Sequence, residues 1–111
     1  MLTPAMDRFL YTLQDLLRKN DVVGVAAMTK FPFRYYDFSK RTPEGKATLT
    51  TVTQEMFDEY YPILFSEEMK KYIYHYAPGR YDIDLQGNAF SIGCLWVEGL
   101  KEPFRLCSMS R

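Results

Sequence analysis

The sequence has few of the residue types on which catalytic and metal sites most often depend. Its 111 residues include one histidine and two cysteines, Cys94 and Cys107. Neither cysteine has a second Cys or His at ligand spacing, so we expect no metal site, and no motif indicates a cofactor. Each cysteine lies in an apolar run, which predicts buried, reduced thiols in a reducing compartment. A disulfide between neighbouring strands is the alternative.

Net charge is absent as well, because 14 Lys and Arg residues balance 14 Asp and Glu residues. Nucleic-acid-binding proteins usually carry an excess of basic residues that displaces phosphate counterions, so we expect no nucleic-acid partner. No apolar run approaches the ~20 residues that cross a bilayer. No basic segment followed by an apolar one marks a signal peptide. These absences predict a cytoplasmic protein with no membrane association.

Apolar and aromatic side chains, by contrast, are abundant. Hydrophobic residues make up 47% of the chain and aromatic residues 16%, enough apolar area to offset the conformational entropy lost on folding. Domains of roughly 100–150 residues are the commonest size. The sequence therefore predicts one globular domain over residues 1–111.

The first part of the chain has helical periodicity. Pro4 suits the first position of a helix, and the apolar spacing predicts that this helix ends near residues 19–20. A shorter helix is expected from residues 20–21 to about residue 28, where Gly24 permits a neighbour to approach closely. The apolar stripe of the first helix comprises Met6, Phe9, Leu10, Leu13, Leu16 and Leu17.

An aromatic strand is predicted over residues 31–38, followed by an exposed loop over 39–46 and a short strand over 47–51. A helix is expected from a cap at Thr51 or Thr53 to residue 64, kinked by Pro62. Ser66 begins another helix, which Pro78 and its neighbours end. The apolar face of that helix comprises Met69, Tyr72, Ile73 and Tyr76.

The remaining sequence predicts strands over residues 81–85, 89–97 and 104–109, with turns at 86–88 and 98–103. Trp96 shares strand parity with Phe90 and Ile92, which favours a place in the core. The whole pattern predicts an α+β domain, with helices first and an antiparallel sheet last.

Several segments resemble the nuclear transport factor 2-like superfamily, which has a cystatin-like fold. They are Phe9–Leu13 running into Lys19–Ala26, Phe31-Pro32-Phe33, Phe57–Phe65, and the Gly-containing strand Ser91–Val97 that ends near a Trp. The resemblance implies N-terminal helices packed on a curved sheet that forms a cone around a cavity. Members include isomerases and dehydratases, and also non-catalytic transport, adaptor and toxin-immunity proteins, so the fold alone does not choose a function.

Asp37 is the principal candidate for catalysis. Its strand parity places it with Phe33 and Tyr35, and a carboxylate at the rim of an apolar cavity can have a raised pKa and act as a general base. The alternative is that Asp37 begins the turn before Ser39.

Other polar groups carry weaker signals. His75, near a helix end, is expected at the surface or in an interface rather than in catalysis. Asp82 and Asp84 alternate on a strand and are expected to be solvated rather than to bind a cation. The pair Lys70-Lys71 is expected to be solvated too.

Two functions follow from these observations. The first is a non-catalytic binding protein, such as a toxin-immunity partner or adaptor, with a protein partner or a homodimer built on the sheet; the surplus of tyrosines supports it. The alternative is an isomerase or hydrolyase that binds a small apolar ligand in the cone, with Tyr35 or Tyr81 as a donor. The residues expected to line that cavity are Phe33, Tyr35, Asp37, Trp96 and Arg105.

Overall fold

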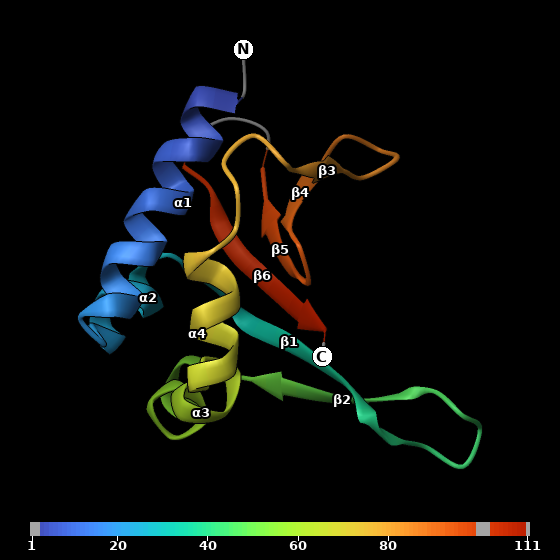
Figure 1. Ribbon diagram of the computed structural model, residues 1–111. Coiled ribbons are helices and arrows are strands. Elements are labelled where there is room, and N and C mark those ends of the chain that lie inside the picture. Colours follow the sequence, from blue (N-terminus) through green and yellow to red (C-terminus); the bar gives the residue numbers. More distant parts are fainter. Residues whose placement is uncertain (1–2, 100–102, 111) are drawn as a thin grey trace.

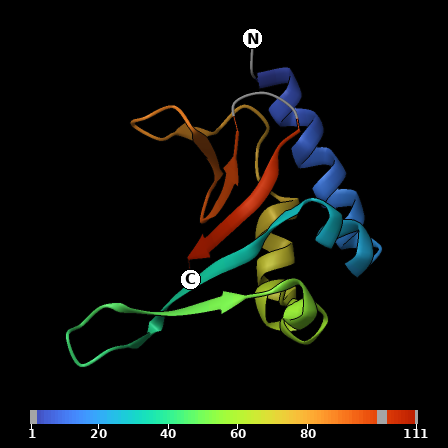
Figure 2. The ribbon, with the colours of Figure 1, turned by 180° about the vertical axis from the view of Figure 1, so that it is seen from behind.

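The computed structural model describes residues 3–99 and 103–110 of the chain. In chain order its elements are α1 (Thr3–Arg18), α2 (Val22–Ala27), β1 (Thr29–Arg41), β2 (Ala47–Val52), the 3-10 helix η1 (Gln54–Met56), α3 (Phe57–Leu64), α4 (Glu67–Tyr74), β3 (Asp82–Ile83), β4 (Ala89–Ile92), β5 (Leu95–Glu98) and β6 (Arg105–Ser110). The helices gather on one side of a six-stranded sheet (Figures 1 and 2). This arrangement confirms the predicted α+β class.

The opening helical pair forms as its sequence pattern predicts. The apolar stripe of α1 is buried, with Leu16 at its margin. Asp21 begins α2 by accepting a hydrogen bond from the Gly24 amide at 2.9 Å, which satisfies one of the helix's unpaired N–H groups. A Cβ at Gly24 would lie 2.7 Å from Leu16 Cδ2, so the expected close approach at this glycine is confirmed.

The sheet has the strand order β2-β1-β6-β5-β4-β3. Its ladders are antiparallel except for β1 and β6, which run parallel and pair Tyr35 with Met109. The prediction of an antiparallel sheet is therefore wrong at this one ladder. The reason is that β6 inserts beside a strand distant in sequence, a pairing that local periodicity does not encode.

The middle of the chain differs from its predicted boundaries. β1 is longer than expected, and together with β2 it forms a hairpin that projects from the body (Figure 1). The expected helix start at Thr51 is wrong, because β2 continues to Val52. The alternative start at Thr53 is confirmed, because Thr53 is the N-cap residue of η1, which leads directly into α3 at Phe57, although the Thr53 side chain makes no capping hydrogen bond. Pro62 lies inside α3 without ending it. The predicted turn over 98–103 includes residues 100–102, which lie outside the described residues.

The strand predicted over 89–97 is two strands. Gly93 has φ +61°, a conformation that glycine adopts readily, and the chain reverses there so that Ile92 pairs with Leu95. The prediction for Trp96 assumed one continuous strand in which Trp96 faces the same side as Phe90 and Ile92. Because the chain reverses, this alternation does not continue to Trp96. Trp96 pairs with Ser91 and points to the face without helices, so its predicted place in the core is wrong.

The core lies between the helices and the inner face of the sheet. The rings of Phe9, Phe90 and Phe104 pack edge to face, with centroids 5.1–6.3 Å apart. Such contacts add to the stabilisation from apolar burial. No helix in the described part of the chain is both long enough and apolar enough to cross a bilayer.

Candidate functional site

The five residues expected to line a cavity do not share one. Phe33 and Tyr35 lie in the core, with exposed fractions of 1% and 5%. Neither they nor Asp37 lines any of five surface hollows in the described part of the chain. The inner face of β1 is thus filled by packed side chains at the place where a cone cavity was expected.

Asp37 lies at the half-buried margin of that face. Its Oδ1 accepts hydrogen bonds from the Ser39 amide at 3.0 Å and from Ser39 Oγ at 2.5 Å. Asp37 pairs with Thr48 across the hairpin. A carboxylate with these bonds stabilises the local backbone, where the pairing of β1 with β2 shifts register after Asp37. No turn begins at Asp37 as the alternative interpretation expected, because β1 continues to Arg41.

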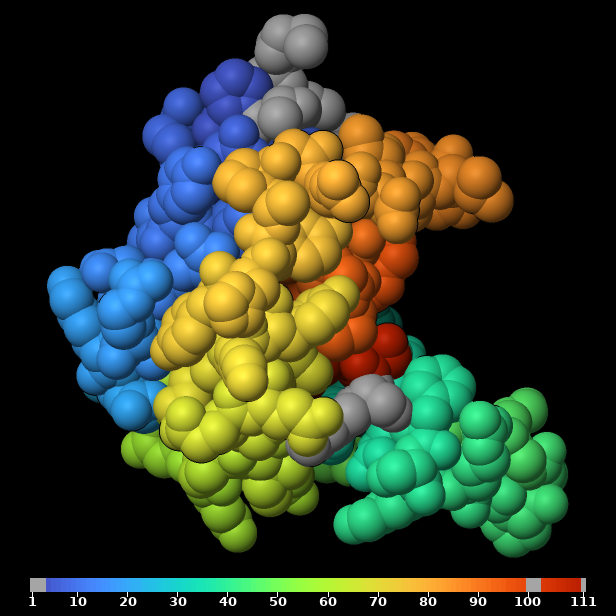
Figure 3. Space-filling view, in the orientation of Figure 1, coloured from blue at the N-terminus to red at the C-terminus, as the bar shows by residue number. Residues whose placement is uncertain are grey.

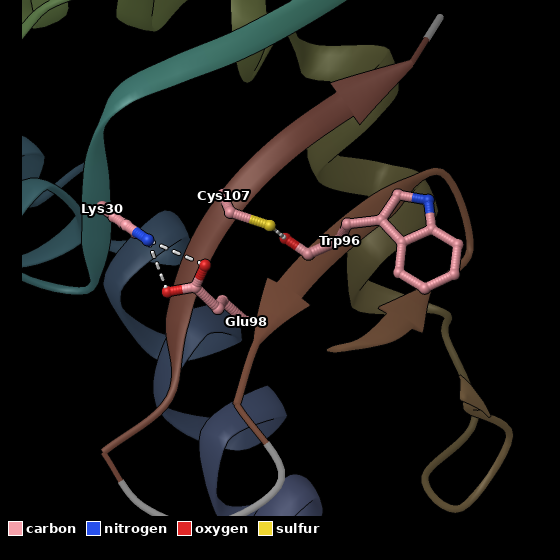
Figure 4. A network of polar contacts seen from close by, with 4 residues as sticks. All are labelled: Lys30, Trp96, Glu98 and Cys107. Carbon is pink, nitrogen blue, oxygen red and sulfur yellow. Dashed lines mark hydrogen bonds and ion pairs between the residues drawn. The ribbon is translucent and has the colours of Figure 1, made fainter. Parts of the chain in front are cut away.

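Trp96 and Arg105 lie on the opposite face of the sheet. Arg105 donates a hydrogen bond to the Ala27 carbonyl at 3.0 Å. Trp96 borders a shallow hollow of about 290 Å³, and its carbonyl accepts a bond from Cys107 Sγ at 3.5 Å. Figure 4 shows this face, where Lys30 also contacts Glu98 in an ion pair of 2.8 Å. Burial raises the pKa of the Cys107 thiol.

Two hollows adjoin along α4 instead. One, of about 590 Å³, extends past the C-terminal end of α4, and the other, of about 380 Å³, lies between α4 and the β4–β5 turn. They share the lining residues Glu68 and Tyr72, and the two adjoining hollows are together called here the α4 groove. Figure 3 shows α4 in yellow beside the orange β4–β5 region and the red end of β6. The groove is lined by Glu68, Met69, Lys71, Tyr72, His75, Tyr76, Ala77, Arg80, Cys94 and Ser110.

The sequence of α4 places two of these side chains on one exposed face. Glu68 and Tyr72 lie four residues apart and share that face, while Tyr76 follows beyond the end of the helix and is half-buried. Ser66 caps the helix, its Oγ accepting a bond from the Met69 amide at 3.3 Å. Tyr72 is 46% exposed, so the prediction that it belongs to the buried face of the helix is wrong.

Lys70 takes the buried position instead, with an exposed fraction of 6%. Its Nζ donates to Asn20 Oδ1 at 2.9 Å and contacts Glu67 Oε1 at 2.8 Å. The hydrogen bond to Glu67 raises the pKa of Lys70. The expectation that Lys70 is solvated is therefore wrong, because the polar loop at Asn20 reaches over α4 and supplies a partner for the ammonium group.

The wall beyond α4 is held in place by tyrosine contacts. Tyr76 and Tyr81 are stacked with their ring centroids 6.3 Å apart, and the Tyr76 hydroxyl donates to the Arg80 carbonyl. Asp7 Oδ1 of α1 accepts bonds from the Tyr81 hydroxyl at 2.5 Å and the Gly79 amide at 3.1 Å. The segment that carries Arg80 is thus tied to α1, which presents the groove in a fixed shape.

The centre of the groove depends on Gly93. A Cβ at this position would lie 1.9 Å from the Tyr72 hydroxyl oxygen, closer than any contact permits. Tyr72 therefore lies directly over the glycine backbone. Burial, and then the nearby Cys94 and Tyr76, raise the pKa of Tyr72, so its hydroxyl remains a neutral donor. Next to it, Cys94 Sγ lies 3.8 Å from Met69 Sδ, which gives the groove an apolar floor.

The charges of the groove have mostly one sign. Lys71 and Arg80 are exposed cations, and Glu68 is the one carboxylate among the lining residues. Within the described part of the chain, none of these three charged residues takes part in an ion pair. Across residues 3–99 and 103–110, no three His, Cys, Asp or Glu side chains gather as a metal site would require.

This arrangement can bind but has few parts for catalysis. Tyrosine rings and sulfur atoms provide apolar contact, while Lys71, Arg80 and the Tyr72 hydroxyl provide donors for an anion. The groove was missed because Tyr72 was assigned with Tyr76 to the apolar face of the helix, whereas Tyr76 packs against the core and Tyr72 is exposed. The signal available in the sequence was the count of tyrosines, which exceeds what one small core can hold.

Comparison of the chain with protein-family models, with curated proteins and with solved structures finds no match. The resemblance to the nuclear transport factor 2-like superfamily therefore stays a prediction.

Proposed function

We propose that this protein is a non-catalytic binding protein, and that its α4 groove takes an extended, acidic segment of a protein partner. The observation that carries the proposal is that two hollows adjoin at Glu68 and Tyr72 and have aromatic walls and exposed cations. Aromatic side chains and Arg are the residues most enriched at protein interfaces. An immunity protein or an adaptor protein would act through such non-catalytic binding of a protein partner.

Charge complementarity favours an acidic partner. Lys71 and Arg80 flank the aromatic part of the groove, and Glu68 alone opposes them. Carboxylates of a bound segment would gain attraction from both cations, and such attraction mainly accelerates association and selects the partner. An apolar side chain of the same segment would fill the hollow formed by Met69, Tyr72 and Cys94.

The placement of the predicted cavity residues supports binding over catalysis. Phe33 and Tyr35 are buried in the core, and Asp37 accepts two hydrogen bonds from Ser39. A general base needs a reacting proton within hydrogen-bond reach. No hollow described here brings a substrate to Asp37.

Selection from a library of random peptides displayed on phage tests the proposal. We expect the enriched peptides to combine Asp or Glu with a large apolar residue, and to lose at least tenfold in affinity for a Lys71→Glu, Arg80→Glu variant. Lys40→Glu with Lys46→Glu, in the distant β1–β2 hairpin, is the matched control and should bind the peptides normally.

Two results would contradict the proposal. One is enrichment of peptides without acidic residues. The other is a set of peptides whose affinity falls in the hairpin variant and not in the groove variant.

A further inference from the structure

The two edges of the sheet differ in how they are protected. A sheet edge exposes unpaired backbone groups, and proteins usually shield it with charge, proline or a very short strand. The edge strand β3 has only two residues, one of which is Asp82, and Asp84 follows directly. The edge strand β2 has six residues, Ala-Thr-Leu-Thr-Thr-Val, with neither charge nor proline.

The outer edge of β2 is also uncovered. Among the described residues β2 pairs only with β1, and no other element lies beyond it in Figures 1 and 2. Leu49 is 49% exposed and Thr51 is exposed beside it. A run of β-branched residues with an open edge is suited to accept another strand.

We propose that β2 pairs with β2 of a second copy of this chain, forming a two-fold dimer with one continuous sheet. In an antiparallel ladder, opposite residues share a face, so inward residues must meet inward ones. Thr48, Thr50 and Val52 face inward, while Leu49 and Thr51 face outward. One register that satisfies this condition places Thr50 opposite Thr50 of the second copy. In that register Leu49 of each copy lies opposite Thr51 of the other.

Charges at the two ends of β2 favour a second copy of the chain as the partner, and they favour this register. Lys46 precedes β2, and in the hairpin tip Lys40, Arg41 and Lys46 outnumber the one carboxylate, Glu44. β2 is followed by exposed acidic residues at Glu55 and Asp58, and none of these charged residues takes part in an ion pair within residues 3–99 and 103–110. Antiparallel pairing puts the basic end of each copy beside the acidic end of the other, twice by symmetry.

Molar mass measured by light scattering tests the dimer. We expect the wild-type protein to approach twice the 13.1 kDa chain mass as its concentration rises, and to dissociate as salt is added. Leu49→Lys with Thr51→Lys opposes like charges across the interface and should give a monomer. Leu49→Glu with Thr51→Lys should keep the dimer, because each Glu then faces a Lys.

The controls separate loss of pairing from loss of folding. Ile83→Lys with Leu85→Lys adds the same charge at the exposed opposite edge and should leave the dimer intact. Circular dichroism should show each variant folded. The proposal would be overturned if the wild-type protein is a monomer, if the Leu49→Lys, Thr51→Lys variant is still a dimer, or if the Leu49→Glu, Thr51→Lys variant is not a dimer. Each of these results is independent of the outcome for the α4 groove.

Discussion

At the scale of single residues, Gly93 and Tyr72 decide the shape of the groove. Gly93→Ala would place a non-glycine residue at φ +61°, which costs roughly 1–2 kcal/mol. The new methyl group would also push the Tyr72 ring out of its place. We therefore expect a modest loss of stability in urea unfolding together with at least tenfold weaker binding of the selected peptides.

Gly45→Ala is the matched control for this change. Gly45 has a similar positive φ of +83°, but a Cβ there would meet nothing within 4 Å. We expect a comparable loss of stability with unchanged peptide binding. Equal binding by the Gly93 and Gly45 variants would show that Tyr72 does not shape the site.

Single residues also mark where prediction from the sequence failed. Trp96 was misplaced because one glycine turn, at Gly93, reversed the strand parity. Tyr72 was expected to be buried and is exposed, while Lys70 was expected to be exposed and is buried. A helical pattern that mixes tyrosine and lysine does not show which side chain has a hydrogen-bonding partner inside the protein. Such outcomes depend on tertiary contacts that a local period cannot contain.

At the scale of elements, Lys70 joins α4 to the α1–α2 connection through Asn20. Lys70→Ala removes a hydrogen bond made by a charged group, and we expect the free energy of unfolding to fall by about 1.5–3 kcal/mol. Lys71→Ala, one position along and exposed, should change it by less than about 0.5 kcal/mol. Urea unfolding compares the two, and equal effects would contradict the role given to Lys70.

Elements with a strong local period were the ones the sequence predicted well. The first helix followed from its apolar stripe, and the hairpin near residue 87 followed from Gln86-Gly87-Asn88. The parallel pairing of β1 with β6 was not predictable, because it depends on where distant strands meet. The α4 groove arises where three such distant segments converge, so its residues could not be grouped from spacing alone.

At the scale of the whole molecule, stability should fall steeply at alkaline pH. Burial raises the pKa of Tyr61 and of Tyr72 above 10.0, and Tyr81 is raised further by burial and by its bond to Asp7. The pKa of Lys70 is raised above 10.5. A raised folded-state pKa contributes stability that is complete below the unfolded value and is lost as pH rises through the folded one.

All four groups therefore act in the same direction. We expect the free energy of unfolding to be level from neutral pH to about pH 9 and to decline above pH 10. Urea unfolding over this range measures it, and Tyr81→Phe should make the decline shallower. A stability that stays level above pH 10.5 would contradict these assignments.

The proposed function depends on binding in the α4 groove and not inside the sheet. Titration of a selected acidic peptide into the protein, followed by backbone amide chemical shifts, tests this most directly. We expect the largest shift changes at residues 68–80 and 93–94, with the shifts of Phe33, Tyr35 and Asp37 nearly unchanged. Changes centred on Asp37, or on Trp96 and the outer face of the sheet, would contradict it.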